Sequence, residues 1–229
     1  MAGLSRLYEL AANLLDVRAR IDAARASAGR TDDVHLIAVT KTWPVSDVRL
    51  LADLGIRDFG ENRDQEAARK AEAFAREDGR EIRWHFIGQL QSNKARSVAR
   101  YAAMVHTVDR PSLAQALARA AQAPLDILVQ VSADGDPHRG GAPVGMLDAL
   151  LASIDAPLRL RGIMAVAPVA MDPDAAFAIV EAAHARVLDR HPDATMRCIG
   201  MSADLEAAVR HGATHVRVGS ALLGSRAVR

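Results

Sequence analysis

The chain places a lysine just after a short apolar segment, and this lysine is the first sign of chemistry. Residues 36–39 read Leu-Ile-Ala-Val, which is typical of a buried strand, and Pro44 cannot continue such a strand. Lys41 is therefore expected at the carboxyl end of the strand, where α/β proteins place their reactive groups. A lysine amine attacks an aldehyde only when unprotonated, which requires that burial or a nearby cation lower its pKa from about 10.4.

Two turns of small residues near the end of the sequence have the composition of a phosphate-binding site. The turn Gly200-Met201-Ser202 follows an apolar strand, and its serine is predicted to cap the next helix over 203–211. The turn Arg217-Val218-Gly219-Ser220 ends the following strand, and it offers close backbone approach at the glycine and a hydroxyl at the serine. In barrels of parallel strands, phosphate commonly lies at the loops after the last two strands. A lysine and a phosphate site together indicate a phosphorylated aldehyde, with pyridoxal 5′-phosphate (PLP) as the leading candidate.

Arg217 admits two ligand-binding roles and one structural role. It could pair with the phosphate, or it could face a pyridine nitrogen, where a permanent cation disfavours protonation of the ring. An unprotonated ring is a weaker electron sink, which limits the reactions that the cofactor supports. The structural alternative is a salt bridge across the top of the barrel. Asn62, just after a predicted strand, could hydrogen-bond a ligand, although asparagine there is more often a turn residue.

Other residues of reactive type fit structural roles better. His85 lies within the strand-like segment 84–88 and is interpreted as a satisfied core group, and Cys198 as an inert core residue. Lys94 is interpreted as an exposed helix lysine. The eight histidines lack zinc-ligand spacing, and the sequence contains no Walker loop, nucleophile elbow or dinucleotide fingerprint. We therefore predict neither a metal site nor a conventional catalytic triad.

The elements that must position these residues alternate between strands and helices. Apolar strands are predicted near 35–40, 56–60, 83–88, 103–107, 126–132, 160–166, 195–199 and 214–218. Helices are predicted near 45–54, 61–76, 92–101, 111–121, 144–155, 173–190, 203–211 and 220–226. Eight such units indicate a closed (β/α)8 TIM barrel. A doubly wound open sheet is the alternative, because alternation alone does not show closure.

An amphipathic helix is predicted before the barrel, over about 4–28. Five leucines are expected on one side of it, namely Leu4, Leu7, Leu10, Leu14 and Leu15, and Gly29 is expected to end it. We expect residues 1–30 to pack on the barrel and the whole chain, 1–229, to form one domain. The segment 133–143 is rich in Asp, Gly and Pro and is expected to form a long loop after the fifth strand.

The composition is that of an ordinary soluble globular protein. Half of the residues are hydrophobic, and 29 basic residues against 28 acidic ones give a net charge of +1, so nothing favours nucleic acid or a charged membrane as partner. The single cysteine excludes an internal disulfide. The sequence has neither an apolar run of spanning length nor a signal-peptide core, which favours a cytoplasmic location.

Six strings of the sequence closely resemble the PLP homeostasis protein family, over about residues 34–226. They are LIAVTKTWP, FGENRDQEA, WHFIGQLQSNKAR, HTVDR, RLRGIMAVAP and GMSADLEAAVRHGATHVRVGSALLGSR. Members of this family resemble the barrel domain of alanine racemase (PLP fold type III) standing alone; they bind PLP, and no substrate turnover is firmly assigned to them. The resemblance implies a Schiff base between PLP and Lys41, with Arg217 facing the pyridine nitrogen and Asn62 near the ring. It also implies that the phosphate is held by Ser202, Gly219 and Ser220, with Met201 lining the site.

The chain departs from the family pattern at three places. Arg63 stands where many relatives have tyrosine, which puts a ring contact there in doubt. Ser220 stands where threonine is common, a change that keeps the hydroxyl. The loop 134–141 differs from its more frequent form, so no role is carried over to it.

Two functions follow from the resemblance. The first is PLP homeostasis, in which the protein holds PLP on Lys41, exchanges it, and delivers it transiently to apo PLP enzymes. The alternative is a fold-type III amino-acid racemase, which needs a second base that related enzymes take from a tyrosine of a C-terminal β domain. This chain ends at Arg229 and its tyrosines, Tyr8 and Tyr101, fall in predicted helices, which favours homeostasis and a monomer, although the first helix could pair. A Schiff-base aldolase fits the barrel but explains the family strings poorly.

Overall fold

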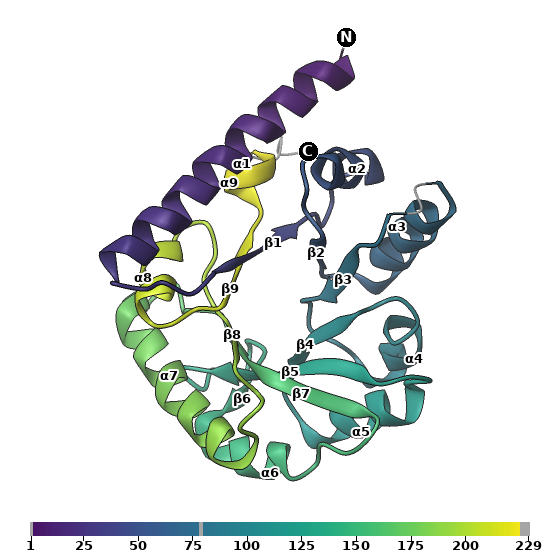
Figure 1. Ribbon diagram of the computed structural model, residues 1–229. Helices are drawn as coiled ribbons and strands as arrows, with labels where there is room; N and C mark the ends of the chain where they lie inside the picture. The colour runs from purple at the N-terminus through teal and green to yellow at the C-terminus, as the bar shows by residue number, and fades with distance from the viewer. Residues whose placement is uncertain (1, 78–79, 225–229) are drawn as a thin grey trace.

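The computed structural model describes residues 2–77 and 80–224, in which eight parallel strands form a closed ring (Figure 1). Around the ring the strand order is β4-β3-β2-β1-β9-β8-β7-β5, and pairing of β4 with β5 closes it. The predicted TIM barrel is confirmed and the open-sheet alternative is wrong. The strands are β1 (His35–Val39), β2 (Asp58–Glu61), β3 (Arg83–Phe86), β4 (Met104–Val108), β5 (Leu125–Ser132), β7 (Leu158–Ala165), β8 (Met196–Cys198) and β9 (His215–Val218).

Helices follow the strands and cover the outside of the ring (Figure 1). They are α2 (Val45–Asp53), α3 (Asp64–Glu77), α4 (Ala95–Val98), α5 (Pro111–Ala120), α6 (Leu147–Leu151), α7 (Pro173–Arg190), α8 (Leu205–Arg210) and α9 (Ser220–Leu223). The predicted helices 92–101 and 144–155 are shorter than expected, and each begins as a tight 3-10 turn, at Ser92–Lys94 and Val144–Met146. Of the predicted helix 220–226, residues 225–226 lie outside the described residues. The predicted loop 133–143 ends in a two-residue strand, β6 (Ala142–Pro143), which pairs with β5.

Side chains of the strands alternate between two hydrophobic layers. Trp84 and Phe86 of β3 face the helices and belong to the large core cluster between ring and helices. Inside the ring, a small cluster contains Ile37, Met104, Leu128, Met164 and Cys198. Because His85 alternates with Trp84 and Phe86, it points into the ring, where it is buried as predicted.

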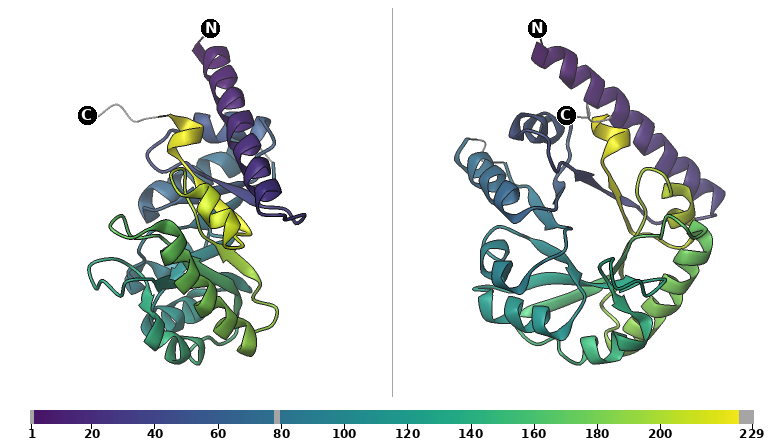
Figure 2. Two further views of the ribbon diagram at one scale, coloured as in Figure 1. Left: turned by 90° about the vertical axis from the view of Figure 1, so that its left-hand side faces the viewer. Right: turned by 180° about the vertical axis from the view of Figure 1, so that it is seen from behind.

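The chain begins with a long helix, α1 (Ala2–Ser27), which lies against α8, α9 and α2 on the outside of the barrel (Figure 2). Its buried face repeats at helical spacing and consists of Leu10, Leu14, Val17, Ile21 and Ala24. Leu4 and Leu15 are 61% and 66% exposed, so their predicted place on this face is wrong. Leu15 lies about 100° around the helix from Leu14, and Leu4 belongs to the first turns, which extend beyond α9 (Figure 1).

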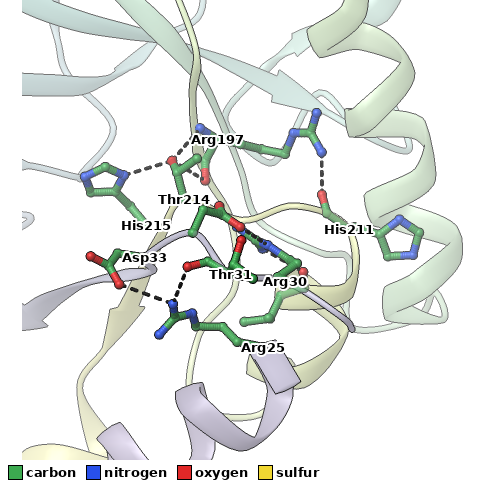
Figure 3. A network of polar contacts seen from close by, with 10 residues as sticks. Arg25, Arg30, Thr31, Asp33, Arg197, His211, Thr214 and His215 are labelled. Atoms are coloured by element: carbon green, nitrogen blue, oxygen red, sulfur yellow. Dashed lines mark hydrogen bonds and ion pairs between the residues drawn. The ribbon is translucent and has the colours of Figure 1, made fainter. Parts of the chain in front are cut away.

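Polar contacts fix the connection between α1 and β1 at the base of the barrel (Figure 3). The Arg25 guanidinium donates to the Thr31 carbonyl (3.1 Å) and pairs with Asp33 (3.2 Å). Arg30 donates to the carbonyl of Val209 in α8 (2.8 Å). The lower end of α1 is therefore tied to the barrel by side chains as well as by its apolar face. Within the described residues, no helix is both long enough and apolar enough to cross a membrane.

Candidate functional site

A pocket of about 370 Å³ opens at the mouth of the barrel, between the carboxyl ends of β1, β8 and β9. Its size lies within the range of small-molecule sites. Six of the seven predicted site residues line it, namely Lys41, Met201, Ser202, Arg217, Gly219 and Ser220, together with Val39, Trp43, Ala203 and Gly224. Residues from the start and the end of the sequence thus meet in one pocket because β1 and β9 are neighbours in the ring.

Lys41 lies in a turn whose two flanking residues are fixed. Thr40 is fully buried; its N–H donates to the Gly60 carbonyl (3.1 Å) and its carbonyl accepts from the N–H of Trp43 (3.0 Å). Thr42 adopts φ = +66°, an unusual conformation for a non-glycine residue. Its N–H donates to a carboxylate oxygen of Glu66 on α3, which holds it there.

A buried ion pair behind this turn supports it. The Lys70 ammonium on α3 donates to the Thr40 carbonyl (2.8 Å), to Oε1 of Glu61 (2.7 Å) and to Oε1 of Glu66 (2.7 Å). Thr40 Oγ1 also donates to Oε1 of Glu61 (2.7 Å), whereas Oε2 of Glu61 is buried and has no hydrogen-bond partner among the described residues. Burial raises the pKa of Glu61, against the opposing effect of Lys70. Sequence reasoning missed Lys70, because its spacing from Glu66 is that of an ordinary surface pair.

The turn after β8 is tighter than the sequence predicted. Gly200 has φ = +89°, and a Cβ there would lie 2.4 Å from Cβ of Ala208, so glycine is required. The predicted role of Ser202 as N-cap is wrong, since α8 begins at Leu205 with Asp204 before it. Asp204 accepts the N–H of Met201 and so closes a turn over 201–204 that delays the helix.

Ser202 instead links the two turns, and the backbone beside it offers donors. Its Oγ accepts the N–H of Ala221 in α9 (3.4 Å). The N–H groups of Ser202 and Ala203 have no acceptor among the described residues. Free N–H groups and hydroxyls that converge beside a glycine suit a phosphate group. At Gly219 a Cβ would contact Val39 at 3.4 Å, so this glycine keeps the pocket open next to β1.

Arg217 is buried inside the ring beneath this pocket. Its guanidinium donates to the carbonyls of Cys198 (2.6 Å) and Ala165 (2.8 Å). No acidic side chain pairs with it among the described residues, so the interpretation as a salt bridge is wrong. Neutral carbonyls orient the group without cancelling its charge, and a positive charge is therefore presented to the pocket. Cys198 is fully buried as predicted, and burial raises the pKa of its thiol.

Asn62 lines a second and larger cavity rather than this pocket. That cavity, of about 600 Å³, lies over the ends of β2–β5 and includes Arg63, Lys94, Arg110 and Arg139. Asn62 Oδ1 is buried without a hydrogen-bond partner among the described residues. A Cβ at Gly88 would lie 2.1 Å from the Asn62 carbonyl, so a glycine there lets the ends of β2 and β3 approach. Lys94, interpreted as an exposed helix lysine, lies at the wall of this cavity.

Asp58, Arg83, His85 and His106 form a chain of polar contacts from the base of the ring inward, in which only Nδ1 of His106 is left buried without a partner among the described residues. Both carboxylate oxygens of Asp58 accept from Arg83 (2.6 Å each), and Oδ1 lies 2.8 Å from Nε2 of His85. His85 Nδ1 lies 2.8 Å from Nε2 of His106. His85 is thus a satisfied core group, as predicted. Among the described residues no group of three or more His, Cys, Asp or Glu is placed to hold a metal ion.

Known proteins are similar to this chain over nearly its whole length. The family described as alanine racemase, N-terminal domain, matches residues 12–227. Pyridoxal phosphate homeostasis proteins of Mycobacterium leprae and Escherichia coli are 43% and 38% identical to the chain, over 98% and 96% of it and 95% and 98% of their own lengths. The chain belongs to the pyridoxal phosphate homeostasis protein family. The resemblance inferred from its motifs is confirmed.

A solved structure similar to this chain contains the ligand that the sequence predicts. PipY of Synechococcus elongatus, solved with PLP bound, superposes with a TM-score of 0.79 and is 31% identical, covering 94% of this chain and 100% of that one. Alanine racemase of Corynebacterium glutamicum has a TM-score of 0.69 at 17% identity and covers 94% of this chain and 60% of that one. At that identity the likeness to the racemase shows a common fold alone.

The tyrosines of this family member lie away from the pocket. Tyr8 is 72% exposed on α1. Tyr101 follows α4, and its hydroxyl lies 3.5 Å from a carboxylate oxygen of Asp64 on the outer side of the barrel. Neither lines the pocket around Lys41.

Proposed function

We propose that the chain binds PLP as a Schiff base on Lys41 and takes part in PLP homeostasis by holding and exchanging it. The observation that carries this proposal is the shared pocket: one lysine, two turns of which the first offers free N–H donors, and one buried arginine line the same 370 Å³. The neutral Lys41 amine would add to the aldehyde carbon, and loss of water would leave a C=N bond. The reaction is reversible with water, which suits a protein that stores and releases a reactive aldehyde.

The residues present fit each part of PLP. Ser202, Gly219 and Ser220 would hold the phosphate with their hydroxyls and backbone, with Met201 at the rim of the pocket. The charge of Arg217 would disfavour protonation of the pyridine nitrogen, so that the ring serves poorly as an electron sink. Asn62 lines the larger cavity and not this pocket, and it is proposed to lie near the ring of bound PLP, where its buried Oδ1 would find a partner.

Racemisation is the second function considered, and the pocket supports it less. A racemase needs a proton acceptor and donor on both faces of the substrate carbon. Lys41 could serve one face, but no tyrosine and no histidine lines the pocket on the other. We therefore propose holding and exchange as the main role, with racemase activity at most weak.

Reduction of the holoprotein tests the proposal directly. The purified protein with PLP should be yellow, and borohydride followed by peptide mass spectrometry should place a pyridoxyl group on Lys41. Lys41→Ala should take up no reducible PLP, whereas Lys94→Ala, at the other cavity, should be labelled like the parent. A pyridoxyl group on another lysine would reject the site. Deuterium exchange at the α carbon of L- and D-amino acids well above that caused by free PLP would favour the racemase.

We further propose that the protein acts as a monomer and passes PLP transiently to apo PLP enzymes. Mixing holoprotein with an apo enzyme should restore the enzyme's activity faster than release into solution allows. Restoration at the rate of free release would argue against direct delivery. Light scattering of the holoprotein should give the monomer mass, and a dimer mass would reject that part of the proposal.

A further inference from the structure

Three polar side chains of α1 reach main-chain carbonyls in the turn after β8 and in the short helix α9 that follows the second turn. Arg20 donates to the carbonyl of Ser202 (3.0 Å), Asn13 to that of Leu222 (2.9 Å) and Arg6 to that of Leu223 (3.0 Å). All three bonds are partly buried, and they join residues about 180 or more positions apart. The views agree that α1 runs alongside α8 and α9, on the side of these turns away from the ring (Figures 1 and 2).

Arg20 joins the turn after β8 to the helix that follows it. Besides Ser202, its guanidinium contacts both carboxylate oxygens of Glu206 in α8, at 2.8 and 3.0 Å. A planar guanidinium that makes three such bonds fixes the turn and the first turn of α8 in one relative position. An isolated ion pair at this exposure contributes little, but the bond to a main-chain carbonyl constrains the backbone itself.

The orientation of that carbonyl determines where the next N–H points. In a planar trans peptide, the C=O of Ser202 and the N–H of Ala203 point in opposite directions. Because Arg20 holds the carbonyl toward α1, the N–H of Ala203 is directed to the other side. Ala203 lines the pocket, and its N–H has no acceptor among the described residues. The arginine outside the barrel therefore aims a donor into the pocket.

The turn after β9 is supported through the short helix α9 that follows it, whose last residues are held by side chains of α1. The helix α9 has four residues, too few to be stable alone. Its last carbonyls, at Leu222 and Leu223, are acceptors that the helix itself cannot satisfy, and Asn13 and Arg6 satisfy them. Ser220 is the first residue of this short helix, so its place at the pocket depends on α1 as well.

We propose that Arg20 is a positioning residue for the phosphate of PLP. Through this residue α1 holds the turns after β8 and β9 from outside the barrel, and it thereby sets how tightly PLP is retained. This inference rests on the proposed function, because it requires that the anion bound at these turns is the phosphate of PLP. It assigns a role in ligand retention to the helix that precedes the barrel. Arg20 acts through the Ser202–Ala203 peptide and does not itself line the pocket.

The test compares PLP with pyridoxal, which has the same aldehyde and ring but no phosphate. Arg20→Gln should raise the PLP dissociation constant about tenfold, equivalent to about 1.4 kcal/mol, and should leave the pyridoxal dissociation constant within twofold. Arg20→Lys should restore part of the PLP affinity, since an ammonium can still donate to one of the acceptors. Arg18→Gln is the matched control on the same helix: Arg18 is exposed, makes no contact with the turns, and should change neither constant.

An unchanged PLP affinity in Arg20→Gln would overturn the inference. An equal loss for PLP and pyridoxal would also overturn it, because general loosening of the barrel would not distinguish the two ligands. If Arg20→Gln fails to fold, Asn13→Ala and Glu206→Gln allow the same comparison of PLP with pyridoxal. Asn13→Ala removes the bond from α1 to the Leu222 carbonyl, and Glu206→Gln weakens the contact of Arg20 with α8. A wild-type protein that forms no adduct on Lys41 would remove the proposed function, and this inference with it; a normal adduct with unchanged selectivity would remove the inference alone.

Discussion

The two ends of strand β2 each carry a carboxylate, and the two differ in how they are satisfied. Asp58, at the base, uses both oxygens, with Arg83 and His85 as partners. Burial alone would raise the pKa of Asp58, but these partners more than offset it and hold the pKa below its usual range. Glu61, at the mouth, uses one oxygen and leaves the other buried without a partner among the described residues, and its pKa is raised.

We infer that the difference at the two ends of β2 distinguishes a carboxylate that serves the fold from one that has an oxygen left for a ligand. A buried polar atom without a partner costs about 1–3 kcal/mol, and such atoms persist mainly where they have a functional role. The free oxygens of Glu61 and Asn62 lie at the mouth, as do the free N–H groups of Ser202 and Ala203. Nε of Arg25 at the base and Nδ1 of His106 inside the ring are also buried without a partner among the described residues, so the contrast holds for these mouth groups and not for every unpartnered atom. Variants of fully partnered groups should therefore change stability, and variants of the free groups should change ligand retention.

The largest effect on stability is expected at Lys70. A variant there tests whether a group serves the fold because it is fully hydrogen-bonded or because it lies away from the mouth. Lys70 is at the mouth but fully engaged, with three oxygen acceptors. Lys70→Met would leave Glu61 buried without its cation, so we expect a loss of about 3–5 kcal/mol in the free energy of unfolding, measured by urea denaturation. Adding Glu61→Gln should recover much of the loss, because the uncompensated charge is then removed.

A small effect of Lys70→Met on unfolding, below about 1 kcal/mol, would contradict this view of the cluster. Arg76→Met is the control, since Arg76 pairs with Glu72 at the same spacing on α3 but at an exposed position. Exposed pairs of this kind contribute about 0–1 kcal/mol. The two variants break ion pairs with the same helical spacing, so the difference between their losses in unfolding free energy measures the effect of burial.

The sequence predicted most of the strands and six residues of the pocket for a physical reason. Strand alternation and strand ends are local signals, and parallel strands bring their carboxyl ends to one edge. Lys41 and Arg217 could be placed at that edge without knowledge of any tertiary contact.

What the sequence could not predict depends on contacts between distant residues. Ser202 has the composition of an N-cap, but the carboxylate of Asp204 closes the turn first. Leu15 fits the predicted apolar face of the first helix, but the face of α1 that packs on the barrel is narrower than the set of five leucines and leaves Leu15 exposed. Arg20 and Lys70 are unremarkable in sequence, because the main-chain carbonyls that they bind, those of Ser202 and Thr40, lie 182 and 30 positions away.

The next largest effect is expected on PLP affinity, at the turns after β8 and β9. There the hydroxyls of Ser202 and Ser220 lie at the pocket and have few protein partners. Ser202→Ala together with Ser220→Ala should raise the PLP dissociation constant about 30-fold, if each lost hydrogen bond is worth about 1 kcal/mol. The free energy of unfolding without PLP should change by less than about 0.5 kcal/mol. Ser153→Ala is the control. It removes a hydroxyl that donates to the Leu150 carbonyl at the end of α6, far from the mouth, and it should leave PLP affinity unchanged. Unaltered affinity in the double variant would reject the phosphate site.

The smallest effect is expected at the base, from His215. Burial, and then the neighbouring His35, lowers the pKa of His215 to about 4, so the folded protein keeps this ring neutral below pH 6.5 while the unfolded chain takes up a proton. Stability from this group is therefore complete above about pH 6.5 and is lost as the pH falls toward 4. The difference in pKa corresponds to at most about 3 kcal/mol, and partial exposure of the ring reduces the expected loss to about 1–2 kcal/mol.

Urea denaturation between pH 7.5 and pH 4.5, without PLP, measures this loss at the base. His215→Gln should flatten the decline by about 1–2 kcal/mol relative to the parent, while His138→Gln, at an exposed loop position, should leave it unchanged. The neighbouring Asp58, Arg83, His35 and His85 are present in both variants. An unchanged decline in His215→Gln would mean that the ring takes up its proton as readily in the fold as in the unfolded chain, and would reject the prediction. PLP affinity at pH 7.5 should be the same in both variants, because His215 lies at the base of the barrel and does not line the pocket at the mouth.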